Sequence, residues 1–323
     1  MTESEADKKT VNSLYENIAD LRRFSYEAMA TVFEVFVVHE DAGYAQQAAY
    51  AVFDVLDRLE AELSRYVENS DISIINNLAV GEKYTAGIDT FNCLKQCRQL
   101  YHDTNGCFDV TIGALFDCWL DKDKKLLSPT EQQLAWAKEH TGADLYLLDE
   151  ELMTVELKKS PLKIDLGGFG KGYAVDEMAK ELGDWGIEKA LIHSGRSSIF
   201  GMGRPDGEKG WPVIISNPLD RGQILERLYL RDYAISGSGL EKGSHIIDPR
   251  SGRPTKGKAA SWSAAATAAV ADGLSTAFMI MSDEEMNQYC RDNRGNLAMV
   301  MKEGGGSVVK FGDWPVDGCV GGG

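Results

Sequence analysis

The spacing of apolar positions predicts strands and helices that follow one another irregularly along the chain. Residues 31–39 (TVFEVFVVH) are rich in β-branched side chains and alternate in polarity, which is typical of a strand. Residues 45–64 carry apolar side chains three and four positions apart, the spacing of an amphipathic helix. The same criterion predicts further helices at 88–104, 130–140, about 173–182, about 270–282 and 283–291.

Strand-like runs fill most of the remaining chain. They lie within 143–166 (LYLL, TVEL and LKIDL) and at 188–193, 198–202, 211–215, 225–235, 297–302 and 307–311. Because helices and strands mix without a βαβα rhythm, the pattern favours the α+β class. No repeat and no Pro- or Ser-rich linker marks a boundary, so we expect one domain over 12–318. Residues 1–11 are predicted to form a disordered acidic arm, and 319–323 (CVGGG) a frayed tail.

Charge narrows the choice of partners. The 323 residues include 50 acids and 34 bases, a formal net charge of −16. This balance argues against nucleic acid and against an anionic membrane surface as partners, since both are bound mainly through Lys and Arg. If the substrate is itself an anion, its charge must be met by a metal or by a local basic cluster. No apolar run of about 18 residues is present, so we expect no membrane span.

The amino-terminal residues and the cysteines bear on the compartment. The first nine residues lack the basic and apolar regions of a signal peptide, which predicts a cytoplasmic protein. A periplasmic location stays open if a leader has been removed. The six cysteines include no C-x-x-C pair, and their distribution fits a reducing compartment.

A glycine-rich segment, Asp165-Leu-Gly-Gly-Phe-Gly-Lys-Gly172, lies between a predicted strand and a predicted helix. Backbone N–H groups in such a turn, together with the helix N-terminus, form a site for phosphate. The segment fits neither the Walker A loop nor G-x-G-x-x-G. Glycine spacing alone therefore leaves two interpretations open, a phosphate site and a tight structural turn.

A second segment, Ser244-His-Ile-Ile-Asp-Pro-Arg-Ser-Gly-Arg-Pro254, places His245 beside a Ser, an Asp and two Arg. Functional side chains often lie in such Gly- and Pro-rich loops, which makes His245 a candidate general base. A structural or merely exposed histidine is the alternative. His193 ends a predicted strand, and packing is the simpler interpretation there.

A third segment, Asp272-Gly-Leu-Ser-Thr276, spaces three oxygen-bearing side chains at i, i+3 and i+4. On a helix Asp272, Ser275 and Thr276 share one face, and an all-oxygen set suits a hard cation such as Mg²⁺. The alternative is that Asp272 caps the N-terminus of the helix, with the small residues packing against a neighbour.

Taken together, these segments resemble the ApbE family, the FAD:protein FMN transferases. The segment SHIIDPRSGRP is the most specific of six matches that keep their order between about residues 26 and 282. The other five lie at Met29-Ala30-Thr31, at Leu63–Tyr66 extending to Asn76, at Phe108–Leu115, at Asp165–Asp176 and at Ala271–Ala277.

The resemblance implies a T-shaped α+β fold, with mixed sheets flanked by helices, two interleaved subdomains and a cleft for FAD. It also implies roles for individual residues. Tyr66 would stack on the flavin near Met29, and His245 would be the catalytic base. The other implied cofactor contacts are Asp109, Val110, Thr111, Asp165, Lys171 and Ile246, and the implied metal ligands are the Gly168 carbonyl, Asp272, Ser275 and Thr276.

The implied reaction is Mg²⁺-dependent transfer of FMN from FAD to a Thr or Ser hydroxyl of an acceptor protein, with release of AMP. Two alternatives remain, an FAD pyrophosphatase and a non-catalytic flavin-binding protein. Ala30 stands where the family pattern has Gly, and Arg196-Ser197 depart from a further family segment, which puts the pocket wall in doubt. The sequence is also compatible with a homodimer.

Overall fold

The computed structural model of this protein describes residues 14–121, 125–220, 222–240, 246–304 and 308–321. Its centre is an eight-stranded sheet in the order β1-β2-β6-β7-β10-β13-β14-β15, and each neighbouring pair is antiparallel. The strands are β1 (Leu21–Ala28), β2 (Thr31–Val38), β6 (Ala190–Ser194), β7 (Ser198–Met202), β10 (Tyr233–Gly239), β13 (Lys258–Ala265), β14 (Leu297–Lys302) and β15 (Val308–Phe311).

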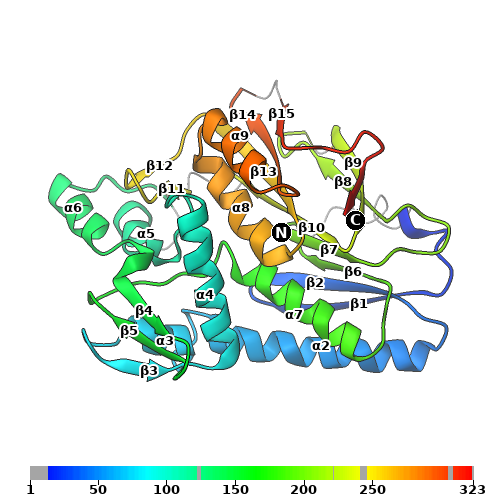
Figure 1. Cartoon of the computed structure of the whole chain (residues 1–323), viewed down its shortest axis with the longest axis horizontal. Coiled ribbons are helices and arrows are strands. Elements are labelled where there is room, and N and C mark those ends of the chain that lie inside the picture. Colours follow the sequence, from blue (N-terminus) through cyan, green and yellow to red (C-terminus); the bar gives the residue numbers. More distant parts are fainter. Residues whose placement is uncertain (1–13, 122–124, 221, 241–245, 305–307, 322–323) are drawn as a thin grey trace.

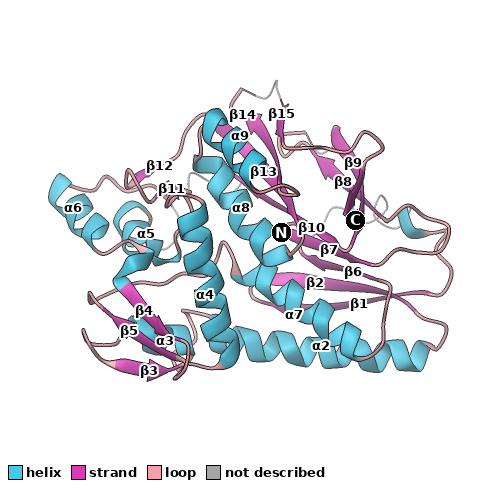
Figure 2. Cartoon of the chain, viewed as in Figure 1, coloured by secondary structure: helices cyan, strands magenta, loops and turns pink. Residues whose placement is uncertain are grey.

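Three helices cover one face of this sheet (Figure 2). They are α2 (Ala42–Leu63), α7 (Gly170–Asp184) and α8 (Ala268–Ile280). Helix α8 packs on β10 and on β13, whose sequence KAASWSAA consists mostly of small residues. Small side chains allow close approach, and the hydroxyls of Ser261 and Ser263 donate to carbonyls of α8. The low β-propensity of this strand is therefore offset by its contacts with the helix above it.

A three-stranded sheet of β8 (Trp211–Ser216), β9 (Ile224–Arg231) and β16 (Cys319–Gly321) packs on the opposite face. A second apolar core fills the space between the two sheets and includes Phe36, Trp211 and Val320. Strand β16 is parallel to β9, and it corrects the prediction of a frayed tail. Residues 319–321 form a strand because their backbone pairs with β9 and because Val320 is buried.

The remaining elements form a second lobe beside α2 and α8, on the left in Figure 1. Its apolar side chains belong to the same continuous core as the helices that cover the main sheet. The elements are α3 (Asp71–Asn76), α4 (Ile88–Asp103), α5 (Gly113–Trp119), α6 (Glu131–Glu139), the sheet β3 (Lys83–Thr85), β5 (Thr154–Leu157), β4 (Tyr146–Asp149), and the 3₁₀ turns η1 (Val110–Ile112) and η2 (Ala143–Leu145).

Helix α9 (Asp283–Asp292) and the short hairpin β11 (Ile247–Asp248) and β12 (Arg253–Pro254) complete the described elements. The α+β class and all the predicted helices are confirmed, with ends shifted by a few residues. The run 225–235 is divided, because Asp232 takes a left-handed backbone (φ 50°) between β9 and β10. Along the described residues, no helix combines the length and apolarity that crossing a membrane requires.

The predicted strand LKIDL (162–166) is also a correction, because these residues form no strand. Their backbone groups are bonded elsewhere. Ile164 N–H donates to the Asn76 side chain, whose amide donates back to the Ile164 carbonyl, and Asp165 N–H donates to the Val110 carbonyl. The segment is thus an extended connection that holds η1 next to the glycine-rich turn. The arm 1–11 lies outside the described residues.

Candidate active site

The glycine-rich turn places the first residues of α7 directly against α8. A Cβ on Gly172 would lie 2.2 Å from the Ala268 carbonyl oxygen, so only glycine permits this approach. The backbone N–H of Gly172 donates to Asp272 Oδ2 at 3.1 Å. The close crossing of two helices therefore delivers a main-chain donor to the carboxylate that is predicted to hold a metal.

Asp176, one turn further along α7, accepts hydrogen bonds from the N–H groups of Ala268 (2.7 Å) and Ala269 (2.8 Å). Burial raises the pKa of this carboxyl to about 7, although the two N–H donors oppose the shift. Thr267 is the N-cap of α8. Asp272 lies in the second turn of α8 and is buried, so the interpretation of Asp272 as a helix cap is wrong.

The predicted metal ligands lie together, although they come from two distant segments. Asp272 is 2% exposed and Ser275 is fully buried on the same helix. A Cβ on Gly168 would lie 3.1 Å from Thr276 Oγ1, which places the glycine turn beside the hydroxyl of Thr276. Carboxylate, hydroxyl and carbonyl oxygens are the donors that Mg²⁺ accepts, so this set fits the ion.

A serine that the sequence analysis did not single out joins the same set. Ser238 Oγ, on β10, lies 2.8 Å from Ser275 Oγ and 3.3 Å from Thr276 Oγ1. The hydroxyl of Ser275 also lies 2.8 Å from the Asp272 carbonyl, within its own helix. No spacing rule could have found Ser238, because only the packing of α8 on β10 brings its hydroxyl next to Ser275 and Thr276.

Lys171 supplies positive charge at this point. Its Nζ donates to the Gly167 carbonyl at 2.7 Å and lies 3.8 Å from Asp272 Oδ2. The lysine predicted to contact the cofactor is thus in ion-pair contact with the predicted metal ligand. Within the described ranges, no group of three or more His, Cys, Asp or Glu side chains is arranged to hold a metal. A metal ion bound here would be coordinated by the Asp272 carboxylate, by neutral oxygens and by oxygens of the bound substrate.

The segment 194–197, which departs from the family pattern, also reaches this site. Ser197 Oγ donates to Asp272 Oδ1 at 3.4 Å, and the Ser197 carbonyl accepts from Gly237 N–H at 2.8 Å. A Cβ on Gly195 would lie 2.3 Å from Thr31 Oγ1. The β1–β2 turn that carries Met29 therefore lies beside the turn that carries Ser197.

The second-lobe side of the site is built on η1. Asp109 Oδ1 accepts from Thr111 N (2.8 Å) and from Thr111 Oγ1 (2.6 Å). Burial raises the pKa of the Asp109 carboxyl to about 6, an effect that these two hydrogen bonds partly offset. Because the Val110 carbonyl accepts from Asp165 N–H at 2.7 Å, two segments predicted to contact the cofactor lie side by side.

Tyr66 follows α2 and is 81% exposed, so one face of its ring is free for a flat ligand. Arg65 joins it to the glycine turn: Nη2 donates to the Tyr66 hydroxyl at 3.0 Å, and Nε lies 3.0 Å from Asp165 Oδ2. The guanidinium carbon also lies 4.9 Å from the centre of the Tyr66 ring. Arg65 was missed as a positioning residue, although its place next to Tyr66 in the sequence was a usable signal.

The predicted base His245 lies outside the described residues, which resume at Ile246. Ile246 is buried, and its carbonyl accepts from Thr255 N–H at 3.0 Å. Ile247 packs in a small cluster with Ile112 and Leu115. The hairpin that follows His245 is therefore held against η1 and α5, next to residues predicted to contact the flavin.

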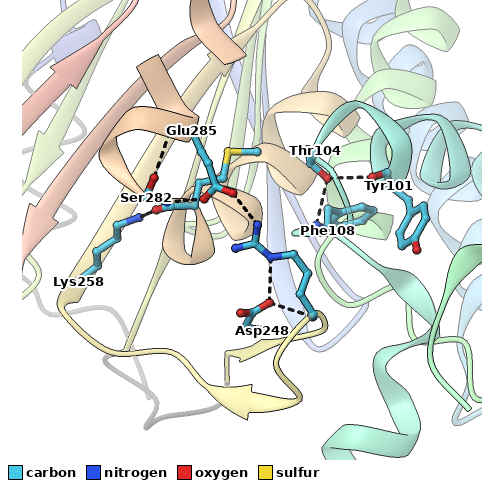
Figure 3. A network of polar contacts seen from close by, with 9 residues as sticks. Tyr101, Thr104, Phe108, Asp248, Lys258, Ser282 and Glu285 are labelled. Carbon is cyan, nitrogen blue, oxygen red and sulfur yellow. Dashed lines mark hydrogen bonds and ion pairs between the residues drawn. The ribbon is translucent and has the colours of Figure 1, made fainter. Parts of the chain in front are cut away.

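Charged side chains fix the far end of this hairpin (Figure 3). Arg250 donates to Asp248 Oδ1 through Nε at 3.3 Å and to Glu285 Oε1 through Nη1 at 2.6 Å. Lys258 is buried and donates to the carbonyls of Phe278 (2.6 Å) and Met281 at the end of α8. Burial lowers the pKa of Lys258 to about 8. Arg250 thus anchors its loop to α9.

Two cavities lie outside this set of residues. One, of about 430 Å³, lies between α4 and α7 and is lined by side chains that include Lys95, Arg98 and Glu177. The other, of about 150 Å³, lies between the end of α4 and α9. Neither contains a predicted site residue, and the cleft expected for FAD stays a prediction.

Comparisons with known proteins agree with the resemblance that the sequence motifs indicate. Residues 29–301 match the ApbE family, and the chain therefore belongs to the ApbE family. Among curated relatives, an FAD:protein FMN transferase of Klebsiella pneumoniae is 28% identical over 295 residues, covering 87% of this chain and 84% of the relative. One from Vibrio cholerae is 26% identical over 302 residues, covering 89% of each.

Solved structures show the same fold. The ApbE protein of Thermotoga maritima superposes with a TM-score of 0.80 at 25% identity, covering 90% of this chain and 97% of that one. The flavin transferase ApbE of Vibrio cholerae gives a TM-score of 0.80 at 24% identity, with the same coverage.

Proposed function

We propose that this protein transfers the FMN group of FAD to a Thr or Ser hydroxyl of an acceptor protein and releases AMP. The observation that carries the proposal is the junction of the glycine turn with α8. There the carboxylate of Asp272, the hydroxyl of Thr276 and the ammonium of Lys171 meet at the N-terminus of α7. Such a junction suits a pyrophosphate, because the Lys171 ammonium supplies positive charge beside oxygens that suit a divalent metal.

In the proposed reaction the acceptor oxygen attacks the phosphorus of the FMN half. The bond from that phosphorus to the bridging oxygen breaks, and AMP leaves with the bridging oxygen. The hydroxyl proton passes to a base, for which His245 is the candidate, because an unperturbed His pKa of about 6.5 suits proton transfer near neutral pH. Lys171 is placed to neutralise phosphate oxygens as charge develops on the leaving group.

Asp272, Thr276, Ser275 and the Gly168 carbonyl would hold Mg²⁺. The hydroxyl of Ser275 is hydrogen bonded to that of Ser238. When bound, Mg²⁺ would neutralise pyrophosphate charge in a protein whose net charge is −16. On the other side Tyr66 offers an exposed ring to the flavin, and Arg65 keeps that ring next to Asp165. The chain thus presents a charged end and an aromatic end to one extended ligand.

The test is incubation with FAD, Mg²⁺ and a Thr-containing acceptor peptide, followed by mass spectrometry. The proposal expects a peptide that carries FMN, together with one AMP per modified peptide, and no product when EDTA replaces Mg²⁺. Free FMN and AMP with an unmodified peptide would indicate a pyrophosphatase. Unchanged FAD, bound but intact, would indicate a non-catalytic flavin protein.

A further inference from the structure

We infer that Lys171 occupies the place of a cation beside Asp272 until FAD arrives, so that metal and FAD bind as a coupled pair. The inference deepens the proposed function and rests on its FAD and metal sites. It begins from two contacts of one ammonium group. Lys171 Nζ is hydrogen bonded to the Gly167 carbonyl at 2.7 Å and lies 3.8 Å from Asp272 Oδ2.

Because Asp272 is buried, its ion pair with Lys171 is important for the stability of the folded protein. The Asp272 side chain is 3% exposed and that of Lys171 is 23% exposed. A buried carboxylate is costly unless charge and hydrogen bonds compensate it. Gly172 N–H and the Ser197 hydroxyl supply hydrogen bonds, and Lys171 supplies the charge.

The same position makes Lys171 a competitor for the metal. A divalent ion held by Asp272 and Thr276 would lie within a few ångströms of the ammonium, and like charges at that distance repel strongly in a poorly solvated site. The metal would also displace the partner that now neutralises Asp272. Without FAD, metal binding must therefore be weaker than the oxygen set alone would allow.

Bound FAD would remove the competition between Lys171 and the metal for Asp272. Its pyrophosphate brings negative charge to the first turn of α7, in which Lys171 lies. The ammonium can then pair with phosphate oxygens and leave Asp272 to the metal. Because coupling between two ligands is reciprocal, FAD should raise the affinity for the metal and the metal should raise the affinity for FAD by the same factor.

The test uses Mn²⁺ as a spectroscopic substitute and follows free Mn²⁺ by electron paramagnetic resonance, first without FAD. Lys171→Gln should bind Mn²⁺ at least tenfold more tightly than the unaltered protein. Lys171→Arg, which keeps the charge, should not. Lys180→Gln is the matched control, since Lys180 lies on the same helix, is exposed and pairs with Glu177 at 3.5 Å. It should leave Mn²⁺ affinity unchanged.

The second half of the test repeats the titration with saturating FAD and no acceptor. The factor by which FAD strengthens Mn²⁺ binding should be large for the unaltered protein and reduced at least tenfold in Lys171→Gln. No gain in the variant without FAD, including absence of measurable binding by either protein, would overturn the inference. The first titration involves neither FAD nor acceptor, so a failure of FMN transfer is distinguishable from a failure of this inference.

Discussion

The two ends of the candidate site are built in opposite ways. At the α7–α8 junction the carboxylate of Asp272 is 2% exposed and surrounded by fixed donors, and a glycine is needed to let the helices meet. At the other end Tyr66 is 81% exposed and is held through one arginine. The first region is organised before any ligand binds, whereas the second offers surface that a ligand must cover.

This contrast indicates how binding and chemistry are divided. Groups that must be placed precisely against a reacting phosphate benefit from a rigid, buried frame. A flat aromatic contact tolerates more freedom, because stacking depends on area rather than on one exact distance. Substitutions at the buried junction should therefore damage turnover, whereas those at the exposed end should mainly weaken FAD binding.

The largest effect is expected from Asp272→Asn. The amide keeps an oxygen for Gly172 N–H, so the protein should fold, but it removes the one carboxylate of the predicted metal set. Losing a metal contribution of several kcal/mol corresponds to a fall in FMN transfer of about 10³-fold or more. Turnover and Mn²⁺ binding measure it, with Asp184→Asn, an exposed change on α7, as the control. Full Mg²⁺-dependent activity in Asp272→Asn would contradict the metal assignment.

His245→Asn should come next. General-base catalysis typically contributes 10²–10⁴-fold, so turnover should fall by about that factor while FAD affinity changes little. Asn can keep one hydrogen bond of a bracing histidine, but it cannot accept a proton near neutral pH. Kinetics combined with a fluorescence titration of FAD separate the two effects. Near-normal transfer by this variant would show that His245 is not the base.

Asp176 should make the stability of the buried junction depend on pH. Its pKa of about 7 in the folded protein exceeds the ordinary value of about 3.9, so the folded state holds the proton more tightly. The contribution of Asp176 is then fully present below about pH 4 and is lost as pH rises through 7. Relative to Asp176→Asn, the unaltered protein should lose about 2.5 kcal/mol of unfolding free energy between pH 5 and pH 8.

Urea denaturation of both proteins at the two pH values, without metal, measures this difference. Asp184→Asn serves again as the control, because its side chain is exposed. A constant difference between Asp176→Asn and the unaltered protein across this range would show that the carboxyl titrates normally.

The sequence predicted the longer helices and most of the strands because their periodicity is local, but it missed the short helices α3 and α5. It failed where tertiary contacts override local preference. Strand β13 is mostly Ala and Ser and is stabilised by α8, and residues 319–321 form β16 only because β9 offers an edge. Residues 162–166 have a strand-like pattern, but their polar groups bond to Asn76 and η1.

The residues of the candidate site divide in the same way, into those that the sequence could predict and those that only the tertiary structure reveals. Motif residues such as Lys171 and Asp272 could be named from the sequence, and the structure brings these two side chains within 3.8 Å of each other. Ser238 could not be assigned, because its importance comes from the packing of α8 on β10, and the ion pair of Arg65 with Asp165 could not be predicted even though Arg65 is next to Tyr66 in the sequence. Their roles depend on which segments fold next to each other, and no local pattern records that.

Tyr66→Ala should have a moderate effect at the exposed end. Stacking of an aromatic side chain on a flat ring contributes about 1–3 kcal/mol, which corresponds to a loss of FAD affinity of about tenfold or more. Turnover at saturating FAD should be almost unchanged, since Tyr66 is predicted to contact the flavin ring and not the reacting phosphorus. A fluorescence titration measures the affinity, and Tyr50→Ala is the control, because Tyr50 is an exposed tyrosine on α2 and not a predicted site residue. Equal affinity in Tyr66→Ala and the unaltered protein would exclude Tyr66 from the flavin site.

The smallest effect concerns the β1–β2 turn beside Ser197. Met29 and Ala30 both have positive φ (49° and 57°), the backbone of a type I′ hairpin turn, in which glycine is favoured. A left-handed residue with a Cβ costs about 1–2 kcal/mol, and glycine avoids that cost but loses more entropy on folding. Ala30→Gly should therefore raise the free energy of unfolding by a few tenths to about 1 kcal/mol. Ala28→Gly, in the extended backbone of β1, should lower it, and thermal unfolding of the three proteins gives both signs. If Ala30→Gly destabilises the protein as Ala28→Gly does, the turn does not have this backbone, and the placement of Met29 beside the site fails with it.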